Sequence, residues 1–420
     1  MAPKLERFVS PGKGNGLRAT GRILKGELVF SAEPLANCVS KKVSRDVCHH
    51  CFTRCETLLR CSQCKMARYC NITCQKQAWS VHKTECKCLR SLLPRIPTDS
   101  VRLAARLIFA LVNVWSHSLF QLFSYSKHKS GILVKMSKLN IFPLSLIFAH
   151  SFSLFSIFLL FLHPIFISPS GPVCPSFLSS YCFLFYSLSL LNHDCRPNCV
   201  MVFEGTKLQL RAVREINPEE ELTISYIETL SLTEDRQRQL EEQYHFTCHC
   251  QRCGCKDTDG LMVSGEEVSW RPMMESLSRL DELKAESNWQ VLLESCKHLL
   301  SAASSVVPDE NLYKLRVTDA ALDACIHLGY WEEALGLGLR TLPVYRQYYP
   351  DPHPVHGVQL MRVGKLQHYL EHISEAADTF KQAYQIIKVT HGDTHSLTKD
   401  LLMKMEECRA EIDQQSFHNN

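Results

Sequence analysis

Hydrophobic and polar residues follow three different patterns along this chain of 420 residues. In residues 5–40 and 187–226, short apolar runs alternate with turn residues, which predicts β-strands. From residue 265 to 415 strand signals are absent and the periodicity is helical, which predicts an all-helical tail. A long apolar stretch between the two strand-rich regions is the third pattern. Strands are expected at residues 16–19, 23–30, 200–203, 208–213 and 222–226, with a hairpin turn at Glu204-Gly205.

The helical tail contains an internal repeat. The segment that begins at Gly329 and ends at Ala334 resembles the one from Glu371 to Ala376, and residues 351–354 resemble residues 393–396 at the same offset. This spacing predicts helix pairs of tetratricopeptide type, somewhat longer than the usual repeat of about 34 residues. Residues 289–300 are a candidate for an earlier, degenerate unit, and a plain helical bundle is the alternative. Stacked helix pairs form a concave surface that binds partners.

The apolar stretch carries no Asp, Glu, Lys or Arg from Leu139 through His193. Its length would allow a membrane span, which needs about 20 apolar residues, and residues 141–167 are the candidate, interrupted by Pro143 and Pro164. Its composition of Phe, Leu, Ser and Pro is also what pyrimidine-rich codons encode. We therefore interpret residues 114–186 as translated intron, with a membrane anchor and a divergent insert as the alternatives, and expect this segment to be poorly ordered or irregularly packed.

Composition narrows the class of protein. The formal net charge of +4 is ordinary for a soluble protein, and the length suffices for two or three domains. The first residues contain no apolar core, so a signal peptide is not expected. A reducing compartment follows, and the 21 cysteines therefore favour metal sites over disulfides.

Eight metal-type ligands lie in four close pairs between residues 48 and 86. Zinc in structural sites takes four thiolate or imidazole ligands, so four pairs can hold two ions. Metal binding would supply most of the folding energy of so short a segment; a disulfide knot is the alternative. The pairs are Cys48 with Cys51, Cys61 with Cys64, Cys70 with Cys74, and His82 with Cys86.

Two further features surround this finger. Between Lys41 and Arg95 there are twelve Lys and Arg residues against three Asp and Glu, a basic patch that could meet nucleic acid, an acidic partner or only solvent. Farther along, Cys248, Cys250 and Cys253 require a fourth zinc ligand. Cys195 is the expected donor, ahead of His249 and Cys255.

The order of these motifs resembles the SET and MYND domain-containing lysine methyltransferases. The resemblance rests on the Gly-rich bend Lys13-Gly14-Asn15-Gly16, the paired ligands of the finger, the run from Asn192 to Asn198, the Glu-Glu-Leu strand before Tyr226 and the last cysteines. It implies an α+β fold, in which a β-rich SET core with an inserted two-zinc MYND finger and a post-SET zinc site precedes an all-α tetratricopeptide-like domain. It also implies that the ligand pairs of the finger interleave, with Cys48, Cys51, Cys70 and Cys74 on one zinc and Cys61, Cys64, His82 and Cys86 on the other.

The same resemblance implies S-adenosylmethionine as methyl donor, three zinc ions in all, and roles for individual residues. Tyr226 matches the catalytic tyrosine that orients the lysine amine. Tyr244 and Phe246 match aromatics that flank the lysine channel and the cofactor. The remaining cofactor contacts are Lys13, Asn15, Asn192 and His193; the family often has Arg where Lys13 stands.

The expected division of the chain places the SET domain on both sides of the finger. Residues 1–47 and 187–232 would form the SET domain, 48–86 the finger, 87–113 the first insert helices, 114–186 the anomalous segment, 233–258 the post-SET region and 265–415 the helical domain. The implied function is lysine methylation of histone and non-histone proteins; the alternative is a non-catalytic adaptor with an interrupted SET core. Expected partners are protein substrates, a chaperone or another peptide partner at the helical domain, and DNA at the basic finger. We expect a monomer, without a membrane anchor, in the cytoplasm and nucleus.

Overall fold

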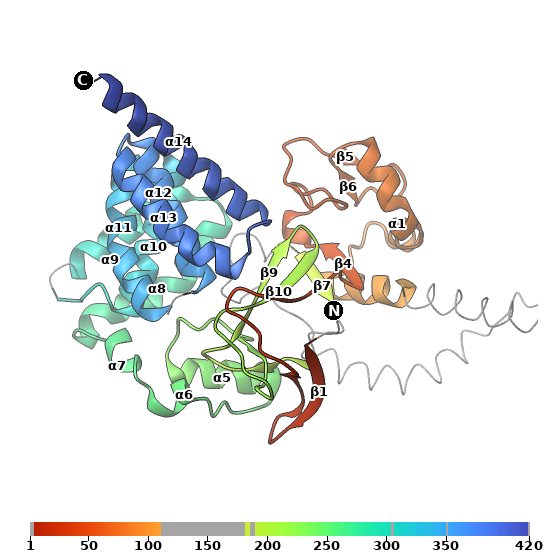
Figure 1. Ribbon diagram of the computed structural model, residues 1–420. Coiled ribbons are helices and arrows are strands. Elements are labelled where there is room, and N and C mark those ends of the chain that lie inside the picture. The colour runs from red at the N-terminus through yellow and green to blue at the C-terminus, as the bar shows by residue number, and fades with distance from the viewer. Residues whose placement is uncertain (1–3, 111–180, 185–189, 304–305, 350–351, 419–420) are drawn as a thin grey trace, which may run out of the picture.

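The computed structural model describes residues 4–110, 181–184, 190–303, 306–349 and 352–418. Strand-rich segments lie between two other parts, the finger on one side and the helical tail on the other (Figure 1). This arrangement confirms the predicted α+β class. The strands are β1 (Leu5–Ser10), β2 (Gly14–Ala19), β3 (Leu28–Ala32), β4 (Ala36–Val39), β5 (Leu59–Arg60), β6 (Arg68–Tyr69), β7 (Tyr181–Leu184), β8 (Asn192–His193), β9 (Cys199–Glu204), β10 (Lys207–Ala212) and β11 (Thr223–Ile224).

Small sheets pack around one core. β1 pairs with β2, and β10 lies between β3 and β9, all antiparallel. β8 and β11 are parallel, which brings residues 192–193 beside residues 223–224. Apolar side chains from these strands are removed from water together, and such burial is the main favourable term in folding. Fully buried members of this core include Ile23, Leu191, Leu208, Leu210, Ile216 and Leu222.

The predicted strand boundaries were partly wrong. The hairpin is confirmed as β9 and β10, but the expected strand at residues 23–30 is interrupted. Gly26 has φ +82° there, and β3 begins only at Leu28, while Ile23 forms an isolated bridge with Ile216. The expected strand at 222–226 is reduced to β11, and the Tyr226 backbone N–H donates to the His193 side chain rather than to a neighbouring strand.

Most of the segment interpreted as translated intron lies outside the described residues, including the candidate membrane span at 141–167. Its four described residues form β7, which pairs antiparallel with β4 from Ala36–Leu184 to Val39–Tyr181. This strand occupies one edge of β4, so at this edge the pairing is regular, contrary to our expectation of irregular packing for the segment. Among the described residues, no helix is both long and apolar enough to cross a membrane.

Helices make up the finger's outer part and all of the tail. α1 (Ile72–Leu92) forms the finger helix, and further helical turns cover residues 99–110. The short 3-10 helix η1 (Lys41–Val43) precedes the finger. The remaining bounds are α5 (Thr233–Tyr244), α6 (Gln251–Cys255), α7 (Asp259–Met262), α8 (Glu267–Ala285), α9 (Trp289–Ala303), α10 (Leu312–Leu328), α11 (Trp331–Tyr348), α12 (Pro354–Tyr369), α13 (Ile373–Thr390) and α14 (Ser396–His418).

The tail repeats at the predicted spacing, and the repeat extends to a third unit. Ser287, Gly329 and Glu371 occupy equivalent turns, and all three have positive φ, at 58°, 79° and 63°. After each, the next backbone N–H donates over 2.9 Å to the carbonyl five residues earlier, at Leu283, Cys325 and Gln367. This is the hydrogen bond of a Schellman helix end. The segment at Trp289 is therefore a structural unit of the same series.

Helix starts repeat at the same interval. Asn311, His353 and His395 each accept a hydrogen bond from the backbone N–H two residues later, over 2.9, 3.3 and 3.1 Å. Each acceptor caps a helix end whose first N–H groups have no partner inside the helix. The two histidines that the sequence places at matching turns are thus helix caps, consistent with packing rather than metal binding.

The tail packs directly against the strand-rich part (Figure 1). The His395 ring nitrogen Nε2 lies 3.0 Å from the Phe203 carbonyl, and the Ser396 backbone donates to Glu204 over 3.0 Å. Tyr349 donates to the half-buried carboxylate of Glu228 over 2.9 Å. These contacts attach the tail to the strand-rich part at two separate places.

The repeated turn yields a stability prediction. A non-glycine residue at positive φ carries a penalty of about 1 kcal/mol that glycine avoids. We expect Ser287→Gly to raise the free energy of unfolding by about this amount and Gly329→Ala to lower it similarly. Urea unfolding followed by circular dichroism measures both, and Ser287→Ala is the control that keeps the penalty. A loss of stability in Ser287→Gly would contradict the assignment.

Candidate active site and zinc clusters

The first ligand set of the finger converges as the resemblance implied. Cys48, Cys51, Cys70 and Cys74 present their sulfur atoms within 4.8 Å of one another. The Cys51–Cys70 and Cys70–Cys74 sulfur separations are 3.7 and 3.3 Å. A zinc tetrahedron with Zn–S near 2.3 Å has edges of about 3.8 Å, whereas a disulfide is about 2.05 Å long. The separations therefore fit a zinc site.

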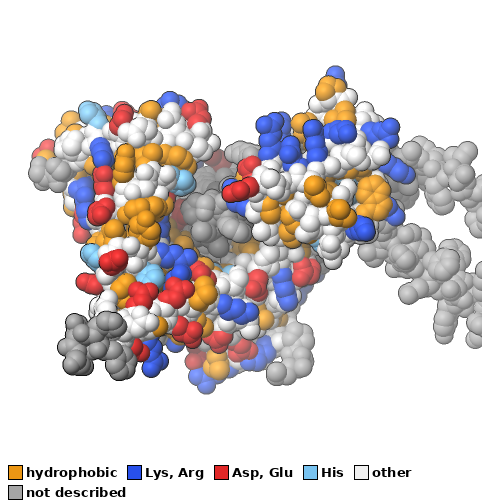
Figure 2. Space-filling model, turned by 90° about the horizontal axis from the view of Figure 1, so that it is seen from above, with side chains coloured by type: hydrophobic (Ala, Val, Ile, Leu, Met, Phe, Trp, Pro, Cys, Tyr) orange, Lys and Arg blue, Asp and Glu red, His pale blue; other side chains and the backbone are white. Residues whose placement is uncertain are grey.

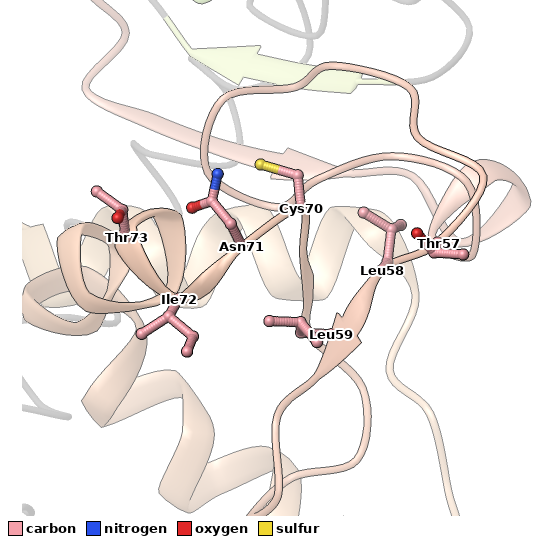
Figure 3. A pocket seen from close by; sticks show the side chains of 7 residues that line it. All are labelled: Thr57, Leu58, Leu59, Cys70, Asn71, Ile72 and Thr73. Carbon is pink, nitrogen blue, oxygen red and sulfur yellow. The ribbon is translucent and has the colours of Figure 1, made fainter.

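The start of α1 positions two of these ligands. Asn71 is its N-cap, and its side-chain oxygen accepts from the Cys74 backbone over 2.8 Å. Cys70 precedes the cap, opposite Leu58 and Leu59 (Figure 3). Helix capping thus holds Cys70 and Cys74 at a fixed separation.

The second ligand set is more deeply buried. Cys61, Cys64, His82 and Cys86 also lie within 4.8 Å of one another. The Cys61–Cys86 sulfurs are 3.8 Å apart, and Cys64 sulfur lies 3.5 Å from His82 Nε2. The side chains therefore gather in the two interleaved sets that the resemblance implied.

A buried carboxylate stands behind this second set. Glu85, one helical turn after His82, lies 3.3 Å from His82 Nδ1. Arg102 and Arg106 contact the same carboxylate at 3.1 and 2.6 Å. Burial alone would raise the pKa of Glu85, but the hydrogen bond with His82 and the two guanidinium charges outweigh it, and the pKa lies well below its usual range. The carboxylate orients the imidazole so that Nε2 faces the metal position.

The same arginines join the finger to the SET strands. Arg102 donates to the Val39 carbonyl over 3.0 Å, and Arg106 donates to the Asn37 carbonyl over 2.7 Å. Both acceptors belong to β4. One carboxylate therefore couples the zinc ligand His82 to the sheet.

The post-SET set includes the predicted fourth ligand. Cys195, Cys248, Cys250 and Cys253 lie within 4.8 Å of one another, and Cys195 and Cys253 sulfurs are 3.5 Å apart. Cys255 is exposed and donates to the Gln251 carbonyl, and His249 is exposed outside the set. Four thiolates complete the tetrahedron, so a third zinc ion fits here.

Aromatic side chains gather next to this cluster. The ring centroids of Tyr226 and Tyr244 are 4.9 Å apart, and those of Tyr226 and Phe246 are 6.3 Å apart in an edge-to-face arrangement. The Tyr226 hydroxyl donates to the Leu191 carbonyl. Burial raises the pKa of Tyr226 above its ordinary value, so the phenol stays protonated at neutral pH.

His193 holds Tyr226 in place. Its Nδ1 accepts from the Tyr226 backbone over 3.0 Å, and its Nε2 lies 3.3 Å from the Cys195 sulfur. Burial lowers the pKa of His193 to about 4, so the ring is neutral. A neutral ring with Nδ1 as acceptor carries its proton on Nε2 and donates to the sulfur. Both nitrogens are therefore engaged within the protein.

The Gly-rich bend at residues 13–16 contacts Asn192, the residue before His193. The Asn192 amide donates to the Asn15 carbonyl over 3.3 Å and to Glu221 over 2.7 Å. Lys13 reaches the same carboxylate at 3.6 Å. A Cβ atom at Gly16 would stand 2.7 Å from a Glu221 oxygen and 2.8 Å from the Phe8 ring, so a larger residue here would displace both side chains. The predicted cofactor contacts Lys13, Asn15 and Asn192 are thus brought together.

Asn198 links the segment around Asn192 to the strand that precedes Tyr226. It is 1% exposed, donates to the Glu221 carbonyl over 2.8 Å and accepts from the Thr223 backbone over 2.8 Å. The segment that begins at Asn192 is therefore tied to the strand that leads to Tyr226.

Sequence reasoning missed Glu85, Arg102, Arg106 and the bridging role of Glu221. In the sequence, Glu221 stood out only as part of the Glu-Glu-Leu motif before Tyr226. The spacing of His82 and Glu85, three residues apart on one helix, was a usable signal, since such residues share a face. The arginines come from a segment without a metal motif and carried no signal.

Comparisons with known proteins agree with this site. A SET domain family model matches residues 14–227. The histone-lysine N-methyltransferase SMYD3 of Homo sapiens is 42% identical over 97% of this chain and 98% of its own length, and SMYD3 of Mus musculus is 42% identical over 98% and 99%. The N-lysine methyltransferase SMYD2 of Homo sapiens is 32% identical over 96% and 98%.

The fold and the matching family model define a SET-domain methyltransferase, a class that uses S-adenosylmethionine. The full-length similarity is more specific: the chain belongs to the SET and MYND domain family of protein-lysine methyltransferases. Its relatives are enzymes by name, which favours catalysis over the adaptor alternative.

The buried carboxylate yields a prediction about zinc. Glu85→Gln removes the charge that faces His82, Arg102 and Arg106, and loss of such a partner costs roughly 10–100-fold in metal affinity. We expect faster zinc transfer to a chromogenic chelator and a lower unfolding temperature. Glu56→Gln, on an exposed residue of the same finger, is the control. Identical zinc release from both variants would contradict a role for Glu85.

Proposed function

We propose that this chain methylates lysine side chains of histones and other proteins, with Tyr226 as the catalytic tyrosine. The proposal is supported above all by the grouping of Tyr226, Tyr244 and Phe246 beside the bend at Lys13 and Asn15. SMYD3 is named a histone-lysine methyltransferase and SMYD2 an N-lysine methyltransferase, which supports both kinds of substrate.

The proposed cofactor site fits an amino-acid-bearing ligand. Lys13 offers a cation whose side chain is 44% exposed, and Asn15 and Asn192 offer amide groups. Gly14 has open space around its Cα, and Gly16 allows close approach. S-adenosylmethionine, when bound, supplies an electrophilic methyl group. Lys13, Asn15 and Asn192 would hold the donor, while His193 acts through its hold on Tyr226.

The proposed chemistry needs alignment and exclusion of water more than covalent work. The reacting amine must be neutral, and well-oriented reactants gain most of the rate from positioning. Tyr226 is half-buried, and the rings of Tyr244 and Phe246 line its surroundings. Because the Tyr226 phenol remains protonated, its oxygen can orient the amine without adding negative charge.

We also propose the domain division stated above, with SET parts at 1–47 and 187–232, the finger at 48–86 and the helical domain at 265–415. Stacked helix pairs generally form a concave binding surface, which supports a peptide or chaperone partner at the tail, and the basic finger supports contact with DNA. A monomer in the cytoplasm and nucleus completes the proposal.

Removal of the Tyr226 hydroxyl tests the catalytic role. We expect Tyr226→Phe to lower kcat by about 10²–10³-fold, the range for loss of one positioned hydrogen-bonding group, while S-adenosylmethionine affinity changes little. Radiolabelled methyl transfer to core histones and calorimetric cofactor binding measure these two quantities.

Tyr369→Phe provides the matched control, because Tyr369 is 62% exposed in the tail. Wild-type kcat in Tyr226→Phe would refute the catalytic assignment. A wild-type enzyme that binds cofactor but methylates no histone, while it methylates other proteins, would refute the histone substrate alone.

A further inference from the structure

A basic cavity lies where the finger meets the SET strands, away from the residues around Tyr226. It is a cavity of about 260 Å³ between the start of the finger, the β6 region and the segment after α1. Blue Lys and Arg side chains gather over the corresponding lobe of the surface (Figure 2). The basic residues that line the cavity are Lys41, Arg45, Arg60, Lys65, Arg68 and Arg102.

The acidic side chain at this cavity is already occupied. Asp99 accepts from the Lys41 backbone over 2.9 Å and from the Ser40 hydroxyl over 2.8 Å. Within the described ranges, Arg45, Lys65 and Arg68 make no ion pair with a carboxylate. Asp99 is the one carboxylate among the lining residues, and the cations outnumber it, so a bound anion would relieve the repulsion among them.

The floor of the cavity is a fixed cation. Arg102 is 3% exposed, and its position is set by Glu85 and the Val39 carbonyl. Its remaining nitrogen, Nη2, has no hydrogen-bond partner in the part of the chain that the structure describes. A buried donor without a partner is unfavourable, because it has lost its hydrogen bonds to water. Because Arg102 lines the cavity, an acceptor that enters the cavity can supply the missing partner of Nη2.

One wall is apolar, which restricts the class of anion. This wall consists of Met66, Leu93, Pro94, Ile96 and Pro97, of which Leu93 is 42% and Ile96 44% exposed. A nucleic-acid backbone presents evenly spaced phosphates flanked by polar sugars and matches an all-polar basic groove. A phosphorylated side chain next to an apolar residue of the same peptide matches both the cations and the apolar wall.

We propose that this cavity binds a phosphorylated side chain of a partner protein. A phosphoserine carries a charge of about −1.5 to −2 and strong acceptor oxygens, and clusters of Arg and Lys are the usual readers of this group. Arg102 supplies the floor of the site, and Arg45 and Lys65 supply its rim. The neighbouring apolar residue of the partner packs on residues 93–97.

A degenerate peptide array tests the proposal with the full zinc-loaded chain. The array holds phosphoserine next to one apolar position, and identical arrays carry serine or glutamate. At 150 mM salt we expect selective capture of phosphopeptides, and anisotropy with the best peptide should show at least tenfold weaker binding for its serine form. Inorganic phosphate should compete. An array without phosphate preference overturns the proposal.

Matched variants separate this cavity from general basicity. We expect Arg45→Gln/Lys65→Gln to weaken phosphopeptide binding at least tenfold, while Lys83→Gln/Lys87→Gln, an equal loss of charge on exposed residues of α1, leaves it unchanged. Unchanged zinc content and unfolding temperature establish that both variants fold. Equal weakening in both pairs, or tighter binding of a 15-base-pair DNA duplex that both pairs weaken equally, overturns the proposal.

Discussion

The active-site region depends on the cluster of Cys195 with Cys248, Cys250 and Cys253. Cys195 and Cys253 lie 58 residues apart in the sequence, and their sulfurs are 3.5 Å apart. A metal ion that closes this loop removes conformational freedom that the unfolded chain would keep. Because Tyr244 and Phe246 lie inside the loop, closure also brings their rings to Tyr226. The zinc cluster is therefore part of what shapes the proposed lysine channel.

The finger is attached to the SET strands by a buried ion-pair network and not by a metal site that joins distant segments. Its ligands lie close together in sequence, so metal binding can order the finger but cannot by itself place it on the SET strands. Glu85 makes that placement, since it contacts His82 on one side and Arg102 and Arg106 on the other. Removing one partner of a buried ion pair is strongly destabilising, because the other charge remains buried without compensation. The position of the finger is thus coupled to the integrity of its own zinc site.

The sequence predicted most reliably those features that depend on local spacing. The twelve predicted metal ligands lie together in the three expected sets, and the 42-residue spacing predicted the helix pairs. Strand boundaries were less predictable, because Gly26 turns the chain inside an apolar run and Tyr226 is held by a distant histidine rather than by a ladder. The contacts of Lys13 with Glu221 and of Asn15 with Asn192 each join segments more than 170 residues apart. No local pattern encodes such a meeting, and the full SET resemblance was needed to expect it.

The helix caps of the tail show how one repeat position can serve two purposes. Asn311 caps α10 with its oxygen and donates its amide to the Ser264 carbonyl over 2.8 Å. His395 caps α14 with Nδ1, while Nε2 faces the Phe203 carbonyl of the SET strands. Serine or aspartate would also cap a helix well, but neither carries a second group that can donate to a carbonyl at the opposite end of the side chain. The choice of asparagine or histidine at this position therefore sets the contact of the helix with the neighbouring element as well as the start of the helix. For His395 that neighbour is the β9–β10 hairpin, so the repeat itself determines how the tail meets the catalytic part of the molecule.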